Sequence, residues 1–185
     1  MIYIKTDEEI EKLRSSCLLV SKTLAMLAPL VQPGVSTKYL DSLAEEFIRD
    51  NGAETPCKGY YGYPCATCMS VNDVVVHGIP SDKTILQEGD IISIDLCTYK
   101  DGFVGDSAYT FAVGDVSDEV RQLLRTTKES LYKGIAMAVA GMPCRPIVRR
   151  QVTLAYARWS DTVWVEVCTK TRRCQTTASG GKDQC

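Results

Sequence analysis

Apolar and polar positions follow a helical period through the first 52 residues. Thr6 with Glu9 three positions later forms a capping box, and an apolar repeat follows it, which predicts a helix from Asp7 to about Leu30. Ser36 caps a second predicted helix over residues 37–51. We expect the apolar stripes of both helices to be core and their charged faces to be solvated.

The pattern then changes to the period of β-strands. Strand-like runs cover 69–80 (MSVNDVVVHGIP), 89–100 (GDIISIDLCTYK) and 103–113 (FVGDSAYTFAV). The turn residues between the last two runs predict a tight antiparallel hairpin. An amphipathic repeat after Ser117 predicts a third helix, which Gly141 and Pro143 stop.

The hairpin carries two aspartates, one in each strand. Asp95 and Asp106 are expected to lie side by side, with the only histidine, His77, just upstream. Adjacent carboxylates repel one another unless a cation lies between them, so the pair is a candidate divalent-metal site. Taken one at a time, a structural histidine, a buried paired aspartate and a turn aspartate are the simpler interpretations.

Composition indicates an ordinary globular chain. It has 185 residues, 45% hydrophobic and 24% charged, with a net charge of −2. The acidic N-terminus and the absence of any run of about 18 apolar residues predict neither a signal peptide nor a membrane span, so the expected location is cytoplasmic. Nine cysteines are read as reduced thiols, and a zinc site at the Cys65–Cys68 CxxC is a minor alternative.

The C-terminal residues differ from the rest. Residues 144–185 hold eight basic and three acidic residues, whereas 1–143 hold 13 and 20, and both tryptophans lie in the tail. The tail arginines follow no helical or strand period, so a specific nucleic-acid partner is not expected.

Three segments together resemble a known family: GYYGYPCATCMSVNDVVVHGIP, EGDIISIDL and DGFVGDSAYTF. They are similar to the type I methionine aminopeptidases of the pita-bread metallopeptidases, over roughly residues 1–143. The resemblance implies an α+β fold, the N-terminal half of a pita-bread fold with an antiparallel sheet covered by helices. Residues 144–185 are then a non-homologous, out-of-frame and poorly ordered tail.

The resemblance also implies roles. His77 would contact the substrate and move a proton at the scissile peptide, Asp95 and Asp106 would be ligands of a dinuclear site, and Asp106 would bridge both ions. Tyr61 stands where many relatives carry a histidine. The residues implied to line the methionine pocket are Cys57, Tyr60, Tyr63 and Cys68.

The implied cofactors are two divalent ions, of Co, Mn, Fe or Zn, about 3.5–4 Å apart and sharing a bridging hydroxide. The implied substrates are the N-termini of nascent polypeptides, with the ribosome as a further partner and no membrane. The family site also needs a histidine and two glutamates from its second half. No histidine follows His77, and Glu166, the only glutamate after Ser130, lies in neither ligand context. We therefore expect weak metal binding and no catalysis by this chain as written.

A shift of reading frame accounts for the missing ligands. If each true codon begins on the third base of a codon in the present frame, residues 156–178 allow the string GHGVGGGVHEDPEVPNYG, which resembles the family's second-half signature. We hypothesise a frameshift between about Gly141 and Tyr156. A divergent C-terminus with its own role is the alternative.

Three function classes remain open. The first is a methionine aminopeptidase. The second is a non-catalytic binding protein of the same fold, whose basic tail contacts the ribosome or RNA. The third is a remnant with an unfinished core and exposed apolar surface.

Overall fold

The computed structural model describes residues 4–139, so the predicted boundary at 143/144 and the predicted tail lie outside the described residues. The described residues fall in two compact units, which divide between Ser117 and Asp118. The helices and strands are α1 (Asp7–Leu27), α2 (Thr37–Asp50), β1 (Thr67–Val71), β2 (Ile91–Lys100), β3 (Phe103–Ala112) and α3 (Asp118–Ala136), with 3-10 helices at Ala28–Leu30 and Tyr60–Gly62.

Helix α1 begins at the predicted capping box. The Thr6 hydroxyl accepts from the Glu9 backbone N–H at 3.2 Å, and the Thr6 N–H donates to the Glu9 carboxylate at 2.8 Å. The predicted end near Leu30 includes the 3-10 helix after α1. Helix α2 begins after Ser36, whose hydroxyl accepts from the Tyr39 N–H at 3.2 Å. Both predicted helices are confirmed.

The sheet has three antiparallel strands in the order β1-β2-β3. The predicted hairpin is confirmed: β2 and β3 are joined by Asp101 and Gly102, with φ of 52° and 85°. Two successive residues of positive φ are typical of the tight turn whose twist matches that of the flanking strands. Ten residues of β2 pair with ten of β3, so the register of this hairpin is set along its whole length.

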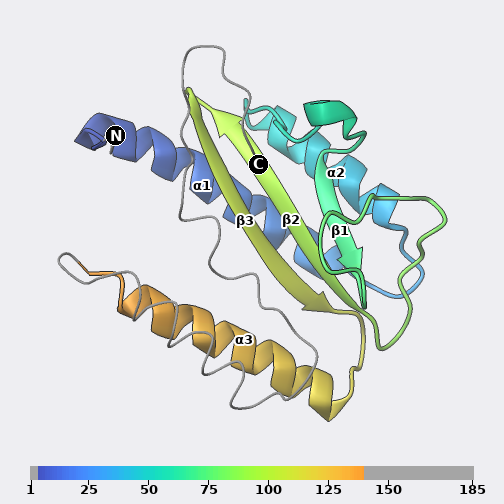
Figure 1. The fold of residues 1–185 in the computed structure, drawn as a ribbon. Helices are drawn as coiled ribbons and strands as arrows, with labels where there is room; N and C mark the ends of the chain where they lie inside the picture. The colour runs from blue at the N-terminus through green and yellow to red at the C-terminus, as the bar shows by residue number, and fades with distance from the viewer. Residues whose placement is uncertain (1–3, 140–185) are drawn as a thin grey trace. The chain divides into compact units, whose positions relative to one another are not determined.

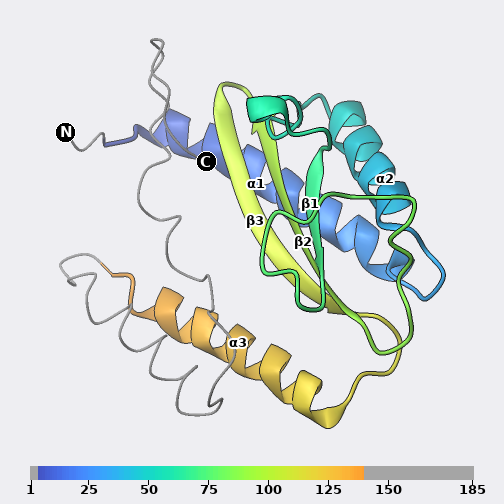
Figure 2. The same ribbon diagram turned by 45° about the vertical axis from the view of Figure 1, so that its right-hand side comes forward.

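Helices α1 and α2 cover one face of this sheet, as Figures 1 and 2 show from two directions. Helix α1 packs against β2 and β3, and α2 packs against α1 and β1. Ile92, Ile94 and Leu96 of β2 point into this layer and are fully buried. This confirms the predicted helix-covered antiparallel sheet for that face. The core includes Leu19, Val20, Leu27, Leu40, Ala44 and Ile48 from the helices.

Among the described residues, one stretch, Asp7–Leu30, is long and apolar enough to cross a membrane by those two criteria. The core helix of a soluble protein meets the same criteria. Because α1 packs its Val20 and Leu24 side chains into the core, we read it as a core helix.

A close helix–strand approach fixes α1 on β3. The Ser16 hydroxyl lies 2.9 Å from the Thr98 hydroxyl and 3.0 Å from the Thr98 carbonyl oxygen, and it accepts the Gly105 N–H at 3.0 Å. A Cβ at Gly105 would lie 2.7 Å from backbone atoms of Ser16 and Cys17. Only glycine fits here without moving the helix.

Two expectations were wrong in part. The predicted strand over 69–80 ends at Val71, where Asn72 takes a φ of 52°, and Val75 is 75% exposed in the loop that follows. Helix α2 also buries a charge: Asp41 lies with Leu40 and Ala44 on the covered face, and its side chain is fully buried. The apolar stripe of α2 therefore includes a carboxylate.

Helix α3 in the second unit starts directly after Ser117, as predicted. Its acidic first turn and Lys133 in its last turn complement the helix dipole. Its buried residues are the small Thr126, Ser130 and Gly134, whereas Leu131 and Ile135 of the predicted amphipathic repeat are 40% and 56% exposed.

Candidate metal centre

The two aspartates lie on the face of the sheet that α1 and α2 leave open. In the β2–β3 register, Asp95 pairs with Ala108 and Cys97 pairs with Asp106. Paired residues of antiparallel strands share a face, so the carboxylates are diagonal neighbours rather than directly opposite. Asp95 is half-buried and Asp106 is exposed. The two carboxylates are therefore neighbours on one face of the hairpin, as expected, but they lie diagonally rather than side by side.

Thiols surround the two carboxylates. Cys68 of β1 pairs with Asp95, and Cys97 of β2 pairs with Asp106. The side chain of Cys57, in the loop before β1, interacts with that of Cys97. The negative charges of both aspartates act on both thiols. The open face therefore combines hard oxygen and soft sulfur groups in one cluster.

The two contacting thiols have opposite pKa shifts. The hydrogen bond with Cys97 lowers the pKa of the Cys57 thiol, against the effects of its burial and of the two nearby aspartates. The hydrogen bond with Cys57 raises the pKa of Cys97, and burial and the negative charges of its neighbours add to that rise. Of the two, Cys57 is the side chain more ready to carry negative charge.

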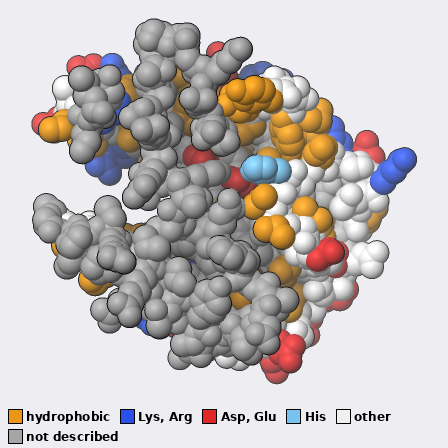
Figure 3. Space-filling model, viewed as in Figure 1, with side chains coloured by type: hydrophobic (Ala, Val, Ile, Leu, Met, Phe, Trp, Pro, Cys, Tyr) orange, Lys and Arg blue, Asp and Glu red, His pale blue; other side chains and the backbone are white. Residues whose placement is uncertain are grey.

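His77 is exposed and has a φ of 56° in the loop after β1. The next residue brings this loop against β1: the Met69 N–H donates to the Gly78 carbonyl oxygen at 2.8 Å, and a Cβ on Gly78 would lie 2.2 Å from the Met69 carbonyl oxygen. His77 thus lies alongside β1, with that strand between it and Asp95. Figure 3 shows the histidine at the surface with hydrophobic side chains beside it.

The predicted pocket residues lie on the loop over 57–63 and at the start of β1. Tyr60 is 38% exposed and stacks edge-on against Tyr61, with ring centroids 4.6 Å apart. The Tyr63 hydroxyl lies 2.9 Å from the carbonyl oxygen of Thr67 and 3.2 Å from that of Gly78. Burial raises the pKa of Tyr63. This hydroxyl connects the tyrosine loop to the histidine loop.

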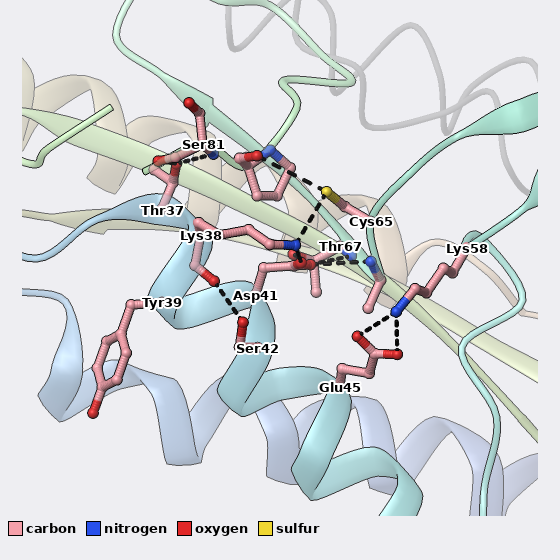
Figure 4. Close-up of polar contacts among 12 residues, drawn as sticks. Thr37, Lys38, Tyr39, Asp41, Ser42, Glu45, Lys58, Cys65, Thr67 and Ser81 are labelled. Atoms are coloured by element: carbon pink, nitrogen blue, oxygen red, sulfur yellow. Dashed lines mark hydrogen bonds and ion pairs between the residues drawn. The ribbon is translucent and has the colours of Figure 1, made fainter. Parts of the chain in front are cut away.

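A buried carboxylate under β1 supports these loops. Asp41 Oδ1 accepts the backbone N–H groups of Ala66 and Thr67 at 3.0 and 2.9 Å and the Thr67 hydroxyl at 2.9 Å, as drawn in Figure 4. Its Oδ2 accepts from Lys38 Nζ at 2.9 Å, and the same ammonium lies 3.7 Å from Cys65 Sγ. This hydrogen bond to Asp41 raises the pKa of Lys38. The network holds the first residues of β1, beside Cys68.

Sequence reasoning missed two residues of this arrangement. Cys97 was read only as a reduced thiol, although its spacing of two from Asp95 in a strand already places both on one face. Asp41 was assigned to a solvated helix face, although its spacing of three and four residues from Ala44 and Thr37 follows the buried stripe.

The aspartate pair fits a divalent ion in its chemistry but is not a complete site. Asp95 and Asp106 supply oxygen ligands from two paired strands, a rigid base for a metal. No group of three or more His, Cys, Asp or Glu side chains among residues 4–139 is placed to hold an ion. The predicted roles of His77, the aspartates and the pocket residues stay predictions.

Comparison with known proteins identifies the family of the chain. Residues 11–160 match the model of metallopeptidase family M24. The chain belongs to that family. This M24 chain is 48% identical to a methionine aminopeptidase of Clostridium acetobutylicum over 141 residues, and 44% identical to that of Escherichia coli K12 over 147. These alignments cover 76% and 79% of this chain but 56% of each relative.

Solved structures give the same family fold. A methionine aminopeptidase from Rickettsia prowazekii superimposes with a TM-score of 0.71 at 38% identity, covering 73% of this M24 chain and 54% of the other. One from Streptococci has a TM-score of 0.80 at 28% identity and covers 85% and 68%. The described residues thus have the N-terminal half of the pita-bread fold, and the chain spans little more than half of the length of the relatives it matches.

Proposed function

We propose that this chain is the N-terminal half of a methionine aminopeptidase, a metal-dependent hydrolase that removes the initiator methionine from nascent proteins. The observation that carries the proposal is the placement of Asp95 and Asp106 on the sheet face that α1 and α2 leave open. The similarity to methionine aminopeptidases at 44–48% identity supports it.

The proposed ligands of this half are Asp95 and Asp106. Divalent ions held there supply Lewis acidity for the scissile carbonyl and activate a water molecule as the nucleophile. The complete site would hold two ions of Co, Mn, Fe or Zn, with Asp95 and Asp106 among their ligands. Two carboxylates alone bind such ions weakly, because the remaining ligands that offset their desolvation are missing.

The other residues act on the substrate in this proposal. Cys57, Tyr60, Tyr63 and Cys68 form the pocket for the methionine side chain, since sulfur packs well against aromatic edges. His77 lies across β1 from Asp95, about 10 Å away in the plane of the sheet, so a peptide laid over the open face of β1 would pass between the two side chains. The imidazole would hold or move a proton at the scissile amide.

Completion of the site requires the second half of the fold. We propose that the frameshift between about Gly141 and Tyr156 removed it, and that the protein acts in the cytoplasm when the frame is intact. The present chain is then expected to fold its first unit and to hydrolyse nothing. Exposed apolar side chains such as Tyr61 and Val75, 78% and 75% exposed, are what an incomplete site would leave uncovered.

The test compares this chain with a version whose frame is restored. Calorimetric titration with Co²⁺ and hydrolysis of a Met-Ala peptide are measured on both. We expect weak binding and no hydrolysis for the present chain, and tight binding of two ions with hydrolysis for the restored one.

Asp106→Asn in the restored chain should abolish hydrolysis, whereas Asp101→Asn, the same charge change at the hairpin turn, should not. A folded restored chain that leaves Met-Ala intact, or that keeps full activity with Asp106→Asn, would contradict the proposal. Nucleotide sequencing checks the frameshift: codons in residues 156–178 that cannot encode GHG would rule it out.

A further inference from the structure

Cys57 and Cys97 are 40 positions apart in the sequence and meet through the backbone. Glu54 and Tyr99 form an isolated antiparallel bridge, with N–H to oxygen distances of 3.0 and 2.9 Å in the two directions. In antiparallel pairing, residues that follow Glu54 run beside residues that precede Tyr99. Counted from the bridge, Pro56 falls beside Cys97 and Cys57 one residue further on, so the segment that carries Cys57 lies along the part of β2 that carries Cys97.

A turn fixes Cys57 in this position. The Lys58 N–H donates to the Thr55 carbonyl oxygen at 3.2 Å, and the Tyr60 N–H donates to the Cys57 carbonyl oxygen at 3.1 Å. The Lys58 ammonium contacts both carboxylate oxygens of Glu45 on α2, at 2.6 and 2.8 Å (Figure 4). The loop that carries Cys57 is thus held at both ends, by β2 and by α2.

The two thiols differ in access. Cys97 is 8% exposed, whereas Cys57 is half-buried, and both are reduced in the structure. A small oxidant can therefore reach Cys57, and Cys97, whose side chain interacts with that of Cys57 and lies on the neighbouring part of β2, can complete a disulfide. The nearby Cys65 is turned elsewhere, toward the Lys38 ammonium and the Pro80 carbonyl oxygen, at 3.7 and 3.9 Å.

We propose that Cys57 and Cys97 are a reversible redox pair that closes to a disulfide and ties the 57–63 loop to β2. With hydrogen peroxide as the oxidant, two thiols and one peroxide give one disulfide and two water molecules: an S–S bond forms, the O–O bond breaks, and the thiol protons leave in the water. A small thiol reverses the step by exchange. Reduced compartments use disulfides of this transient kind.

Formation of this disulfide would change the open face of the sheet. Oxidation consumes the thiol paired with Asp106 and fixes the tyrosine loop beside the carboxylates. The proposal does not rest on peptidase activity, because the pairing of the thiols can be measured in the chain as it is.

Tryptic peptide mapping tests the pairing directly. Cleavage at Arg49, Lys58, Lys83 and Lys100 separates the cysteines: Cys57 falls in 50–58, Cys97 in 84–100, and Cys65 with Cys68 in 59–83. The full chain is treated with one equivalent of hydrogen peroxide, alkylated and digested without reductant. We expect peptide 50–58 joined to 84–100, lighter by two hydrogen atoms than the sum of the two, and separated again by a small thiol.

Single variants complete the test. Cys57→Ser and Cys97→Ser should each abolish that linked peptide, whereas Cys68→Ser, the matched change on the same face, should leave it. Phenylarsine oxide, which bridges neighbouring thiols, should join the same two peptides in the reduced wild-type chain, a measurement that needs no variant to fold. Linkage of 50–58 to 59–83, or oxidation of Cys57 alone to the sulfinic acid, would overturn the proposal.

Discussion

The two faces of β2 are built from alternating residues of one strand, yet they have opposite character. Ile92, Ile94 and Leu96 are fully buried under the helices, whereas Asp95 and Cys97 between and beside them face the open side. The covered face gives the sheet its stability through apolar burial. The open face gathers like charges and thiols, which contribute little to stability. The position of the candidate site on the open face therefore depends on the apolar packing of the opposite face of the same strand.

The largest effect is expected on the covered face. Ile94→Ala removes a fully buried side chain and should lower the free energy of unfolding by about 2–5 kcal/mol, because it loses apolar transfer energy and leaves a cavity. Urea denaturation measures this. The matched Ile94→Val should cost only about 1 kcal/mol. Equal losses in the two variants would show that packing on this face is loose.

A smaller effect is expected where α1 touches β3. Gly105→Ala puts a Cβ 2.7 Å from the Ser16 and Cys17 backbone, so α1 must shift. This shift should lower the free energy of unfolding by about 1–3 kcal/mol. Ala108→Ser adds one atom to the exposed side of the same strand and should change stability by less than about 0.5 kcal/mol. Thermal unfolding compares the two. A neutral Gly105→Ala would mean that the helix does not approach this closely.

The smallest effect on stability is expected on the open face. Asp106→Asn should change the free energy of unfolding by no more than about 0.5 kcal/mol, since the residue is exposed and its removal relieves repulsion from Asp95. The same substitution should weaken Co²⁺ binding by more than about 10-fold, because losing a ligand should cost more than losing a residue that only hydrogen-bonds to a ligand. A variant that loses stability but not affinity would reverse the comparison between the faces.

Local sequence signals predicted most of the first unit. The Thr6 capping box set the start of α1, and the Asp101-Gly102 turn set the hairpin and thereby the register of the aspartates. These features are determined by residues close in the sequence, so the sequence alone was enough. The strand at Val74–Val76 failed because β-branched residues favour a strand only where a partner strand exists, and Asn72 turns the chain away first.

The rest depends on contacts between distant residues. Asp41 is buried because Ala66 and Thr67, 25 and 26 residues later, supply N–H donors to its carboxylate. The Cys57–Cys97 pair depends on the bridge from Glu54 to a strand 45 residues on. Local spacing marks the faces on which Cys97 and Asp41 lie, but no local pattern marks the distant residues that they contact, so these contacts were visible only in the fold.

The Ser16 hydroxyl has a consequence for local opening of the sheet. Because it accepts the Gly105 N–H and contacts the Thr98 hydroxyl, the turn end of β3 cannot separate from β2 without also breaking a contact of α1. Amide hydrogen exchange at Gly105 should then follow global unfolding rather than fraying of an edge strand. Asp106 is the next residue in the chain, so this proposed metal ligand is attached to one of the last parts of the described sheet to open.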